Sequence, residues 1–173
     1  MHAEIRFSAP WSFAVKIITT LTLMLLLGVS FYGTLFFPAA APLPAKLAMT
    51  ALPLAIVMGA LPFLVRGYVL TPGELRVERL GWQNRFVLAA IVSAEINPDA
   101  LRGSIRLCGS GGLFGFFGWF RNKRLGIYRA YGTDPKRAVI LKLTDRTIVI
   151  TPDHPERFLA ELNSLRGLRS DAS

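Results

Sequence analysis

The sequence predicts a two-helix transmembrane hairpin followed by a mainly β domain that a C-terminal helix caps. Three observations lead to this fold class. Two long uncharged runs lie near the N-terminus, 17 of the 20 Lys and Arg residues follow Val65, and short apolar segments alternate with turn residues thereafter. Uncharged runs of about 20 residues match the thickness of a bilayer, whereas alternation of apolar and polar residues is typical of half-buried strands.

The first uncharged run, residues 17–37, is 21 residues long. As a helix it would rise about 31 Å, enough to span the hydrocarbon core. Trp11 and Lys16 at its entry and Tyr32 toward its exit suit the two interfaces. A cleaved signal peptide is the alternative, because Ala39–Ala41 resembles a cleavage site, but the apolar core of a signal peptide is shorter. We therefore expect an uncleaved anchor.

The second uncharged run, residues 47–65, follows three prolines between positions 38 and 44. Proline cannot continue the interior of a helix, so these prolines predict a tight turn between two helices. Pro53 and Pro62 are expected to kink the second helix, which transmembrane helices tolerate. Neither run contains Asp, Glu, Lys, Arg or His, which argues against ion or proton transport.

The distribution of charge predicts the orientation. Arg6 and Lys16 precede the first span, Lys46 alone lies in the turn, and from Arg66 onward Lys and Arg exceed Asp and Glu by 7. The positive-inside rule then places both chain ends in the cytoplasm. An acidic ligand, such as anionic lipid or an acidic protein face, would also suit this charge, but we expect no nucleic-acid partner.

Four stretches of the basic part read as strands. Residues 68–77 predict a hairpin around the Thr71–Glu74 turn, and residues 138–150 predict a second hairpin. Residues 85–96 form another largely apolar stretch, and residues 104–108 form a short alternating one. With the intervening segment, six or seven short strands are expected, as in a partly open barrel.

The chain is expected to close with an amphipathic helix. Asp153 with Glu156 resembles a capping box, and Pro155 falls in the first turn, where its missing N–H is tolerated. Gly167 is placed to end the helix. Four apolar residues share the face that should pack on the open end of the sheet: Phe158, Leu159, Leu162 and Leu165.

Residues 109–132 are rich in glycine and aromatic residues, with Gly112, Gly115 and Gly118 three apart. A phosphate-binding loop is the first functional idea. The segment lacks both the G-x-G-x-x-G pattern and a following Gly-Lys-Ser/Thr, so neither nucleotide-binding fingerprint is met. Nucleotide binding is therefore not expected.

This segment carries a resemblance to a known family. The runs LFGFFG (113–118), LG (125–126), YRAY (128–131) and TPD (151–153) resemble the bacterial pleckstrin-homology-like (PH-like) domains. The resemblance covers about residues 66–166. Many members of that family also follow a pair of membrane helices.

The resemblance implies a bent sheet of about seven strands, closed at one corner by a C-terminal helix. Together with the hydropathy and charge pattern, it divides the chain into four expected segments: a cytoplasmic N-terminal segment (1–16), the transmembrane hairpin (17–65, with spans 17–37 and 47–65), the PH-like domain (66–167) and a disordered tail (168–173). The expected location is the bacterial inner membrane, with the domain in the cytoplasm. Inositol-lipid binding is not implied, because the first hairpin turn carries no Lys or Arg.

The aromatic and basic part of this segment supplies the candidate contact residues: Trp119, Phe120, Arg121, Lys123 and Arg124. In one interpretation they touch anionic lipid head groups at the membrane surface. In a second they bind another protein or a second copy of the chain. In a third the neighbouring aromatic residues are core, the glycines permit bends, and residues 121–124 form a solvated turn.

No constellation for catalysis is visible. His2 and His154 stand apart, Cys108 is the single cysteine and can form no intrachain disulfide, and the acidic residues are few and dispersed. We expect no enzyme, cofactor or metal. The sequence predicts a membrane-anchored scaffold or interaction module at the cytoplasmic face; the alternatives are an anionic-lipid sensor and an accessory subunit of a larger membrane complex.

Overall fold

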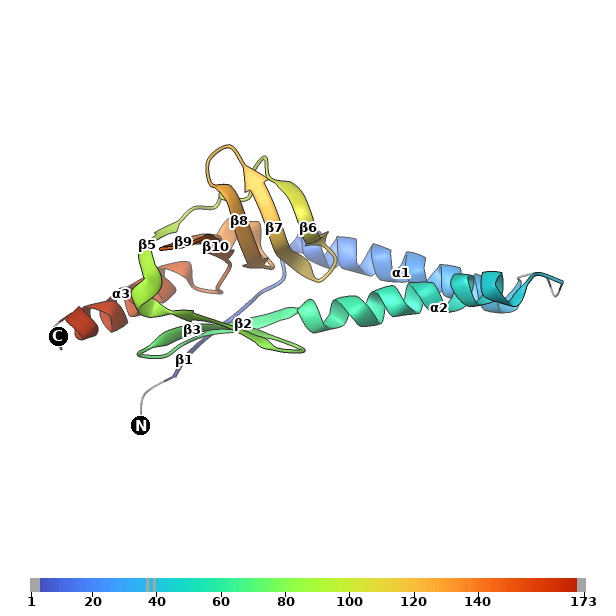
Figure 1. The fold of residues 1–173 in the computed structure, drawn as a ribbon, viewed down its shortest axis with the longest axis horizontal. Helices are drawn as coiled ribbons and strands as arrows, with labels where there is room; N and C mark the ends of the chain where they lie inside the picture. The colour runs from blue at the N-terminus through green and yellow to red at the C-terminus, as the bar shows by residue number, and fades with distance from the viewer. Residues whose placement is uncertain (1–3, 37, 39, 171–173) are drawn as a thin grey trace.

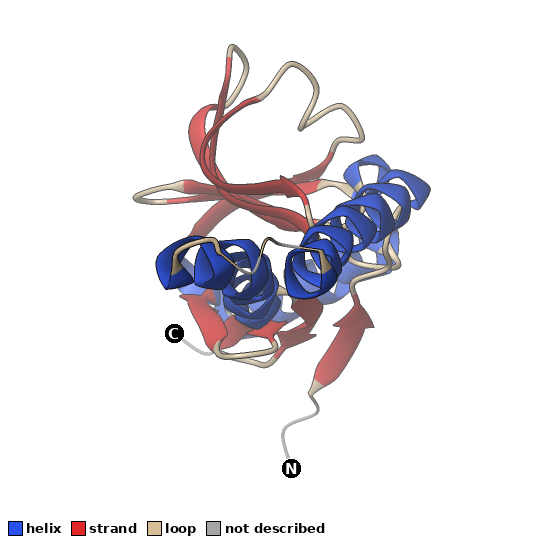
Figure 2. Ribbon diagram, turned by 90° about the vertical axis from the view of Figure 1, so that its right-hand side faces the viewer, coloured by secondary structure: helices blue, strands red, loops and turns tan. Residues whose placement is uncertain are grey.

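The computed structural model describes residues 4–36, 38 and 40–170. A pair of antiparallel helices, α1 (Phe13–Leu35) and α2 (Leu43–Ala60), projects from one end of a β domain (Figure 1). Seen along the hairpin in Figure 2, strands lie both above and below the base of the two helices. The long axis of the molecule thus runs from the helix tips to the C-terminal helix α3 (Pro155–Ser170).

Both helices of the hairpin begin earlier than the uncharged runs predicted. The hydroxyl oxygen of Ser12 accepts a hydrogen bond from the Val15 N–H (3.2 Å), so α1 starts at Phe13. Pro44 lies in the first turn of α2 rather than in the preceding loop, because a first turn needs no donor there. Pro62 lies in the 3-10 turn η1 (Leu61–Phe63) that follows α2. The predicted end of the first span, Phe37, lies outside the described residues.

The two helices pack closely near their tips and leave most apolar side chains on the outside. Ser30 donates a hydrogen bond to the Thr50 carbonyl (2.7 Å), and a Cβ added at Gly33 would meet Met49 at 2.7 Å. Large side chains such as Leu21 and Met24 are more than half exposed. Both α1 and the segment from α2 through η1 are long and apolar enough to cross a membrane.

A four-stranded antiparallel sheet forms one side of the domain. It comprises β1 (Ile5–Ser8), β2 (Val65–Leu70), β3 (Glu74–Arg79) and β4 (Gln83–Val87), in that order. The β2–β3 hairpin confirms the predicted one. Strand β1 was not predicted: it lies before α1, yet it pairs with β2 throughout, from Ile5 opposite Leu70 to Ser8 opposite Gly67.

A six-stranded sheet forms the other side. Its strands are β5 (Ile91–Ile96), β6 (Ile105–Gly112), β7 (Gly115–Asn122), β8 (Gly126–Gly132), β9 (Val139–Leu143) and β10 (Thr147–Ile150). The order is β5-β9-β10-β8-β7-β6, with β10 and β8 parallel and the other pairs antiparallel. The β9–β10 hairpin confirms the one predicted within residues 138–150.

The expectation of about seven strands in one bent sheet was wrong. The described chain has ten strands in two sheets and no closed barrel. The apolar stretch 85–96 is not one strand, because the 3-10 turn η2 (Leu88–Ala90) divides it into β4 and β5 and carries the chain from one sheet to the other. Phe86, Leu88 and Ile91, on the two sides of Ala89, are buried. A run of apolar residues around such positions does not by itself distinguish a crossing between sheets from a single strand.

The C-terminal helix packs its apolar face as expected but differs at both ends. It begins at Pro155. The Asp153 carboxylate accepts a hydrogen bond from the neighbouring His154 N–H (3.0 Å), whereas the predicted capping box requires a donor N–H in the first turn of the helix. Phe158 and Leu162 are fully buried in the core between the two sheets. The helix continues through Gly167 to Ser170, so the predicted stop was wrong and the first residues of the predicted tail are helical.

The tip of the β6–β7 hairpin is attached to α1. Thr19 is buried in this contact: its hydroxyl donates a hydrogen bond to the Gly112 carbonyl (3.3 Å) and accepts one from the Phe114 N–H (3.0 Å). The ring of Trp11 lies 6.2 Å from that of Phe114. The first turns of α1 therefore belong to the domain rather than to the projecting part of the hairpin.

Replacing Thr19 with Val should loosen this attachment. Valine has nearly the same shape but leaves the buried Phe114 N–H without its acceptor, which costs about 1–3 kcal/mol. We expect faster amide hydrogen exchange at residues 110–116 in the purified chain, with little change in β9 and β10. Unchanged exchange at the β6–β7 tip would show that the hydroxyl does not hold it.

Candidate functional site

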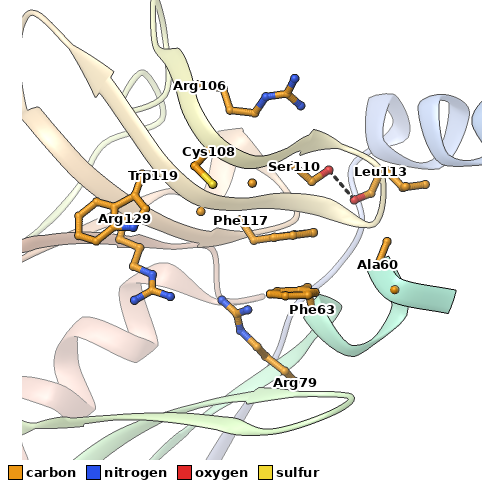
Figure 3. A pocket seen from close by; sticks show the side chains of 13 residues that line it. Ala60, Phe63, Arg79, Arg106, Cys108, Ser110, Leu113, Phe117, Trp119 and Arg129 are labelled. Carbon is orange, nitrogen blue, oxygen red and sulfur yellow. Dashed lines mark hydrogen bonds between the residues drawn. The ribbon is translucent and has the colours of Figure 1, made fainter. Parts of the chain in front are cut away.

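A pocket lies where the helical hairpin meets the two sheets. Its volume is about 610 Å³. The last turn of α2 and η1 form one wall, the end of β3 forms the floor, and β6, β7 and β8 form the opposite wall (Figure 3). The lining combines apolar side chains with two inward-pointing arginines, Arg79 and Arg129. A third arginine, Arg106, also lines the pocket, but its guanidinium lies apart from those of Arg79 and Arg129 (Figure 3).

Arg79 is the last residue of β3 and is almost completely buried, with 6% of its surface exposed. Its guanidinium carbon lies 4.8 Å from the ring centre of Tyr131, 5.5 Å from that of Trp82 and 5.8 Å from that of Phe63. Its Nε is buried and has no hydrogen-bond partner among the described residues. Aromatic faces attract a cation but supply no acceptor atom in the guanidinium plane, so the N–H groups remain available.

Arg129, in the middle of β8, approaches the same place from the other sheet. Its guanidinium carbon lies 5.4 Å from the ring centre of Tyr131 and 5.5 Å from that of Trp119. Its Nε is also buried without a hydrogen-bond partner in the described part of the chain. Figure 3 shows the guanidinium groups of Arg79 and Arg129 directed into the same space.

No acidic side chain lines the pocket within the described ranges. The ion pairs between described residues involve other arginines and include neither Arg79 nor Arg129. The guanidinium groups of Arg79 and Arg129 therefore have no carboxylate in the pocket to balance their charge. A buried charge in this condition is unfavourable for folding, which is why such sites mark function more often than stability.

The electrostatics of Arg79 reflect this arrangement. Burial lowers its pKa from the ordinary value, and the nearby positive charge of Arg129 lowers it further, whereas Tyr131 and Tyr68 act in the opposite direction. Arginine nevertheless stays protonated in proteins. Burial disfavours the charged form of Tyr131 as well, which for a tyrosine raises the pKa. Its hydroxyl is therefore neutral at physiological pH and provides no counter-charge.

The glycines of the aromatic segment shape the wall formed by β6 and β7. Gly109 and Gly118 face each other across the two strands, with φ of +109° and +117°. A Cβ at either position would lie 2.1 Å from a backbone oxygen of the other strand. The two strands can approach this closely only with glycine at both positions, and the absence of side chains leaves the wall flat beside the arginines.

Only one of the five predicted contact residues borders the pocket. Trp119 lies on its rim, 39% exposed, over Arg129. Phe120 was a candidate surface contact but is buried, with its ring 6.0 Å from that of Tyr128, because successive residues of a strand point to opposite faces. A surface contact by Phe120 is therefore inconsistent with the structure.

The three predicted cations lie away from the pocket. They are exposed at or beside the turn between β7 and β8: Arg121, Lys123 and Arg124. This turn lies at the opposite end of β7 from the β6–β7 tip, which touches α1. Arg124 also pairs with Glu95 at 3.5 Å. This surface is separate from the arginine pocket, and whether it contacts lipid or a partner protein stays a prediction.

Sequence reasoning missed Arg79 and Arg129, although a signal for the first was present. Leu75, Val77 and Arg79 alternate on one face of β3, and all three are buried. The same alternation that predicts the strand therefore places Arg79 among core positions. No comparable local signal exists for Arg129, because its partner in the pocket comes from a different sheet.

The expected absence of an enzyme activity, a cofactor and a metal stays a prediction. Among the described residues, no group of three or more His, Cys, Asp or Glu side chains lies close enough to hold a metal ion. Four dispersed acids of the β domain each form an ion pair with a different arginine: Glu95, Asp99, Asp134 and Asp145.

Comparison with known proteins agrees with the fold. The model of the family described as "Bacterial PH domain" matches residues 66–166. This range contains β2 to β10 and most of α3, so it includes both arginines of the pocket. No curated protein and no solved structure matches the chain. A mainly β domain with a C-terminal helix and a family match over more than half of its length together show that the chain belongs to the bacterial PH domain family.

Proposed function

We propose that this protein is a membrane-anchored, non-enzymatic interaction module whose arginine pocket binds a phosphate- or carboxylate-bearing ligand at the cytoplasmic face of the membrane. Membership of the family supports an interaction module, with protein or lipid as the class of ligand. The arginine pocket favours an anionic ligand within that class.

The observation that carries the proposal is the pair of uncompensated guanidinium groups. Arg79 and Arg129 each keep a buried Nε without a hydrogen-bond partner in the described chain. A guanidinium presents several N–H donors in one plane and binds phosphate or carboxylate through two parallel hydrogen bonds. An anion between Arg79 and Arg129 would satisfy those donors and neutralise the charge that burial makes unfavourable.

Membrane anchoring is supported by the exposed surface of the hairpin. Apolar side chains along α1 and α2 are exposed in this chain, as with Leu25 and Met58, both at about two thirds of full exposure. A continuous apolar surface of this kind requires a cover, and the length of both helices suits a bilayer. The pairing of β1 with β2 keeps the N-terminal segment with the domain, so cleavage after α1 would remove one strand of the sheet.

The same pairing supports the proposed orientation. Because β1 precedes α1 and β2 follows α2, both ends of the hairpin lie on the side of the domain. The excess of Lys and Arg from Arg66 onward then favours the cytoplasmic side.

The proposal is tested by anion-dependent stability of the full chain in a mild uncharged detergent. A ligand that binds only the folded state raises Tm in a saturable way. We expect inorganic phosphate, compared with chloride at equal ionic strength, to raise Tm of the wild type and to leave the Arg79→Met/Arg129→Met variant unaffected. The variant should itself be folded, with Tm at or above the wild-type value, because methionine removes two buried charges.

The matched control is Arg121→Met/Arg124→Met, which removes two exposed cations outside the pocket. It should keep the wild-type response to phosphate. The proposal is wrong if phosphate does not stabilise the wild type, or if it stabilises the pocket variant as much as the wild type.

A further inference from the structure

We infer that the anionic group held by Arg79 and Arg129 is the head group of an anionic bilayer lipid, whose acyl chains leave the pocket along the α2 wall past Gly59. This inference rests on the proposed function, because it names the source of the anion that the pocket binds. It concerns the pocket between η1, β3 and β8, and not the turn of the first hairpin.

The pocket lies at the level where the hairpin would enter a bilayer. Its α2 wall consists of Gly59, Ala60 and Phe63, which lie near the end of the second candidate span. Aromatic side chains concentrate at the interface of membrane proteins. Phe63 packs edge-to-face on Trp82, with ring centres 4.7 Å apart, and the Trp82 and Leu80 side chains of the β3–β4 turn are 40% and 52% exposed beside it.

The β3–β4 turn is held at this level by the helix end. The Gly81 N–H donates a hydrogen bond to the Pro62 carbonyl (3.2 Å), and the Leu80 N–H donates one to the Leu64 carbonyl (3.1 Å). The exposed apolar side chains of the turn therefore have a defined position next to the end of α2. An apolar rim at an interface suits contact with lipid, and the arginines lie behind it.

The two ends of the pocket differ in chemistry, as an amphiphile requires. The guanidinium groups lie at the β3 and β8 end, whereas Ala60, Leu113 and Phe117 provide apolar surface on the side of the hairpin. At Gly59 an added Cβ would meet nothing within 4 Å, so the helix surface there is open. A soluble phosphate would use the arginines alone; a lipid would use the arginines and the apolar wall together.

The charge of the pocket selects among lipids. A zwitterionic head group brings a cation next to its phosphate, and that cation would need a carboxylate or an aromatic face. No acidic side chain lines the pocket in the described ranges, and the rings of Tyr131, Trp82 and Trp119 already face guanidinium groups. Net anionic lipids such as phosphatidylglycerol are therefore preferred over phosphatidylcholine.

The decisive experiment compares two glycine variants of the full chain in nanodiscs. Gly59→Leu adds an apolar side chain beside the pocket, at a position where a Cβ meets nothing within 4 Å, and leaves both arginines intact. Gly28→Leu is the matched control, because Gly28 lies in α1, is equally open and does not line the pocket. Tm is measured in pure phosphatidylcholine and in phosphatidylcholine with one quarter phosphatidylglycerol, and the lipid retained by the protein is counted by native mass spectrometry.

We expect phosphatidylglycerol to raise Tm of the wild type and of Gly28→Leu. Gly59→Leu should retain at least about tenfold less anionic lipid than the wild type. Gly59→Leu should still respond to inorganic phosphate in detergent, which shows that the arginines remain competent. The inference is overturned if Gly59→Leu retains phosphatidylglycerol like the wild type. It is also overturned, with the proposed function left intact, if the wild type responds to phosphate but not to phosphatidylglycerol. A response to neither anion overturns both.

Discussion

Replacing Gly118 with Ala is expected to prevent the β6–β7 hairpin from forming. At φ of +117° an L-residue is strained, and the new Cβ would lie 2.1 Å from the Cys108 carbonyl oxygen and 2.8 Å from the Gly109 Cα. Because both contacts are with backbone, no side-chain rotation relieves them. We expect a loss of about 4 kcal/mol or more, in the range of the most damaging single substitutions, and a fall in Tm of more than about 15 °C for a domain of this size.

Gly126→Ala separates backbone strain from steric conflict. Gly126 also has a positive φ, +67°, but an added Cβ would meet nothing within 4 Å. It should therefore cost only about 1 kcal/mol, the penalty for a left-handed residue without a clash. Equal losses of Tm at Gly118 and Gly126 would contradict the close approach of β6 and β7.

The second large effect is expected at Phe7. This residue is 4% exposed in the main core, and its ring packs edge-to-face on that of Phe158 with centres 5.2 Å apart. Phe7→Ala should cost about 3–5 kcal/mol, the usual range for a buried phenylalanine, and lower Tm by more than about 10 °C. The result would show that the segment before the first helix is part of the folded domain.

Arg6→Ala is the matched control on the same strand. Arg6 is exposed, and its ion pairs with Glu4 and Glu78 lie at the surface, at 3.4 and 3.7 Å. Pairs of this kind contribute little, so Tm should change by no more than a few degrees. If Phe7→Ala were as mild as Arg6→Ala, β1 would not be docked on the core.

Elements that depend on neighbours in sequence were predictable. The absence of charge over residues 17–37 and 47–65 indicated two long apolar helices, and the turns at Thr71–Glu74 and Thr144–Arg146 indicated the hairpins β2–β3 and β9–β10. A hairpin is defined by a short turn and by alternation on either side of it. This information lies within about a dozen residues, so no knowledge of the rest of the chain is needed.

Strand β1 and the crossing at η2 were not predictable in this way. Strand β1 has only four residues, which carry too little periodicity to indicate a strand. It exists because β2, some 60 residues later, offers a pairing edge. The apolar stretch 85–96 gave no local sign of a break, although its two halves belong to different sheets. Burial by distant elements thus decided what local pattern left ambiguous.

The candidate site shows the same division. Alternation along β3 places Arg79 on the face of Leu75 and Val77, and the sequence by itself determined the arginines, the glycines and the apolar helices that the site uses. Only the tertiary structure decided that Arg79 and Arg129 from separate sheets would share one pocket at the end of α2, and that Phe120 would be buried while Trp119 stayed at the rim. Local propensities act over a few residues, whereas the meeting of two sheets depends on the packing of the whole domain.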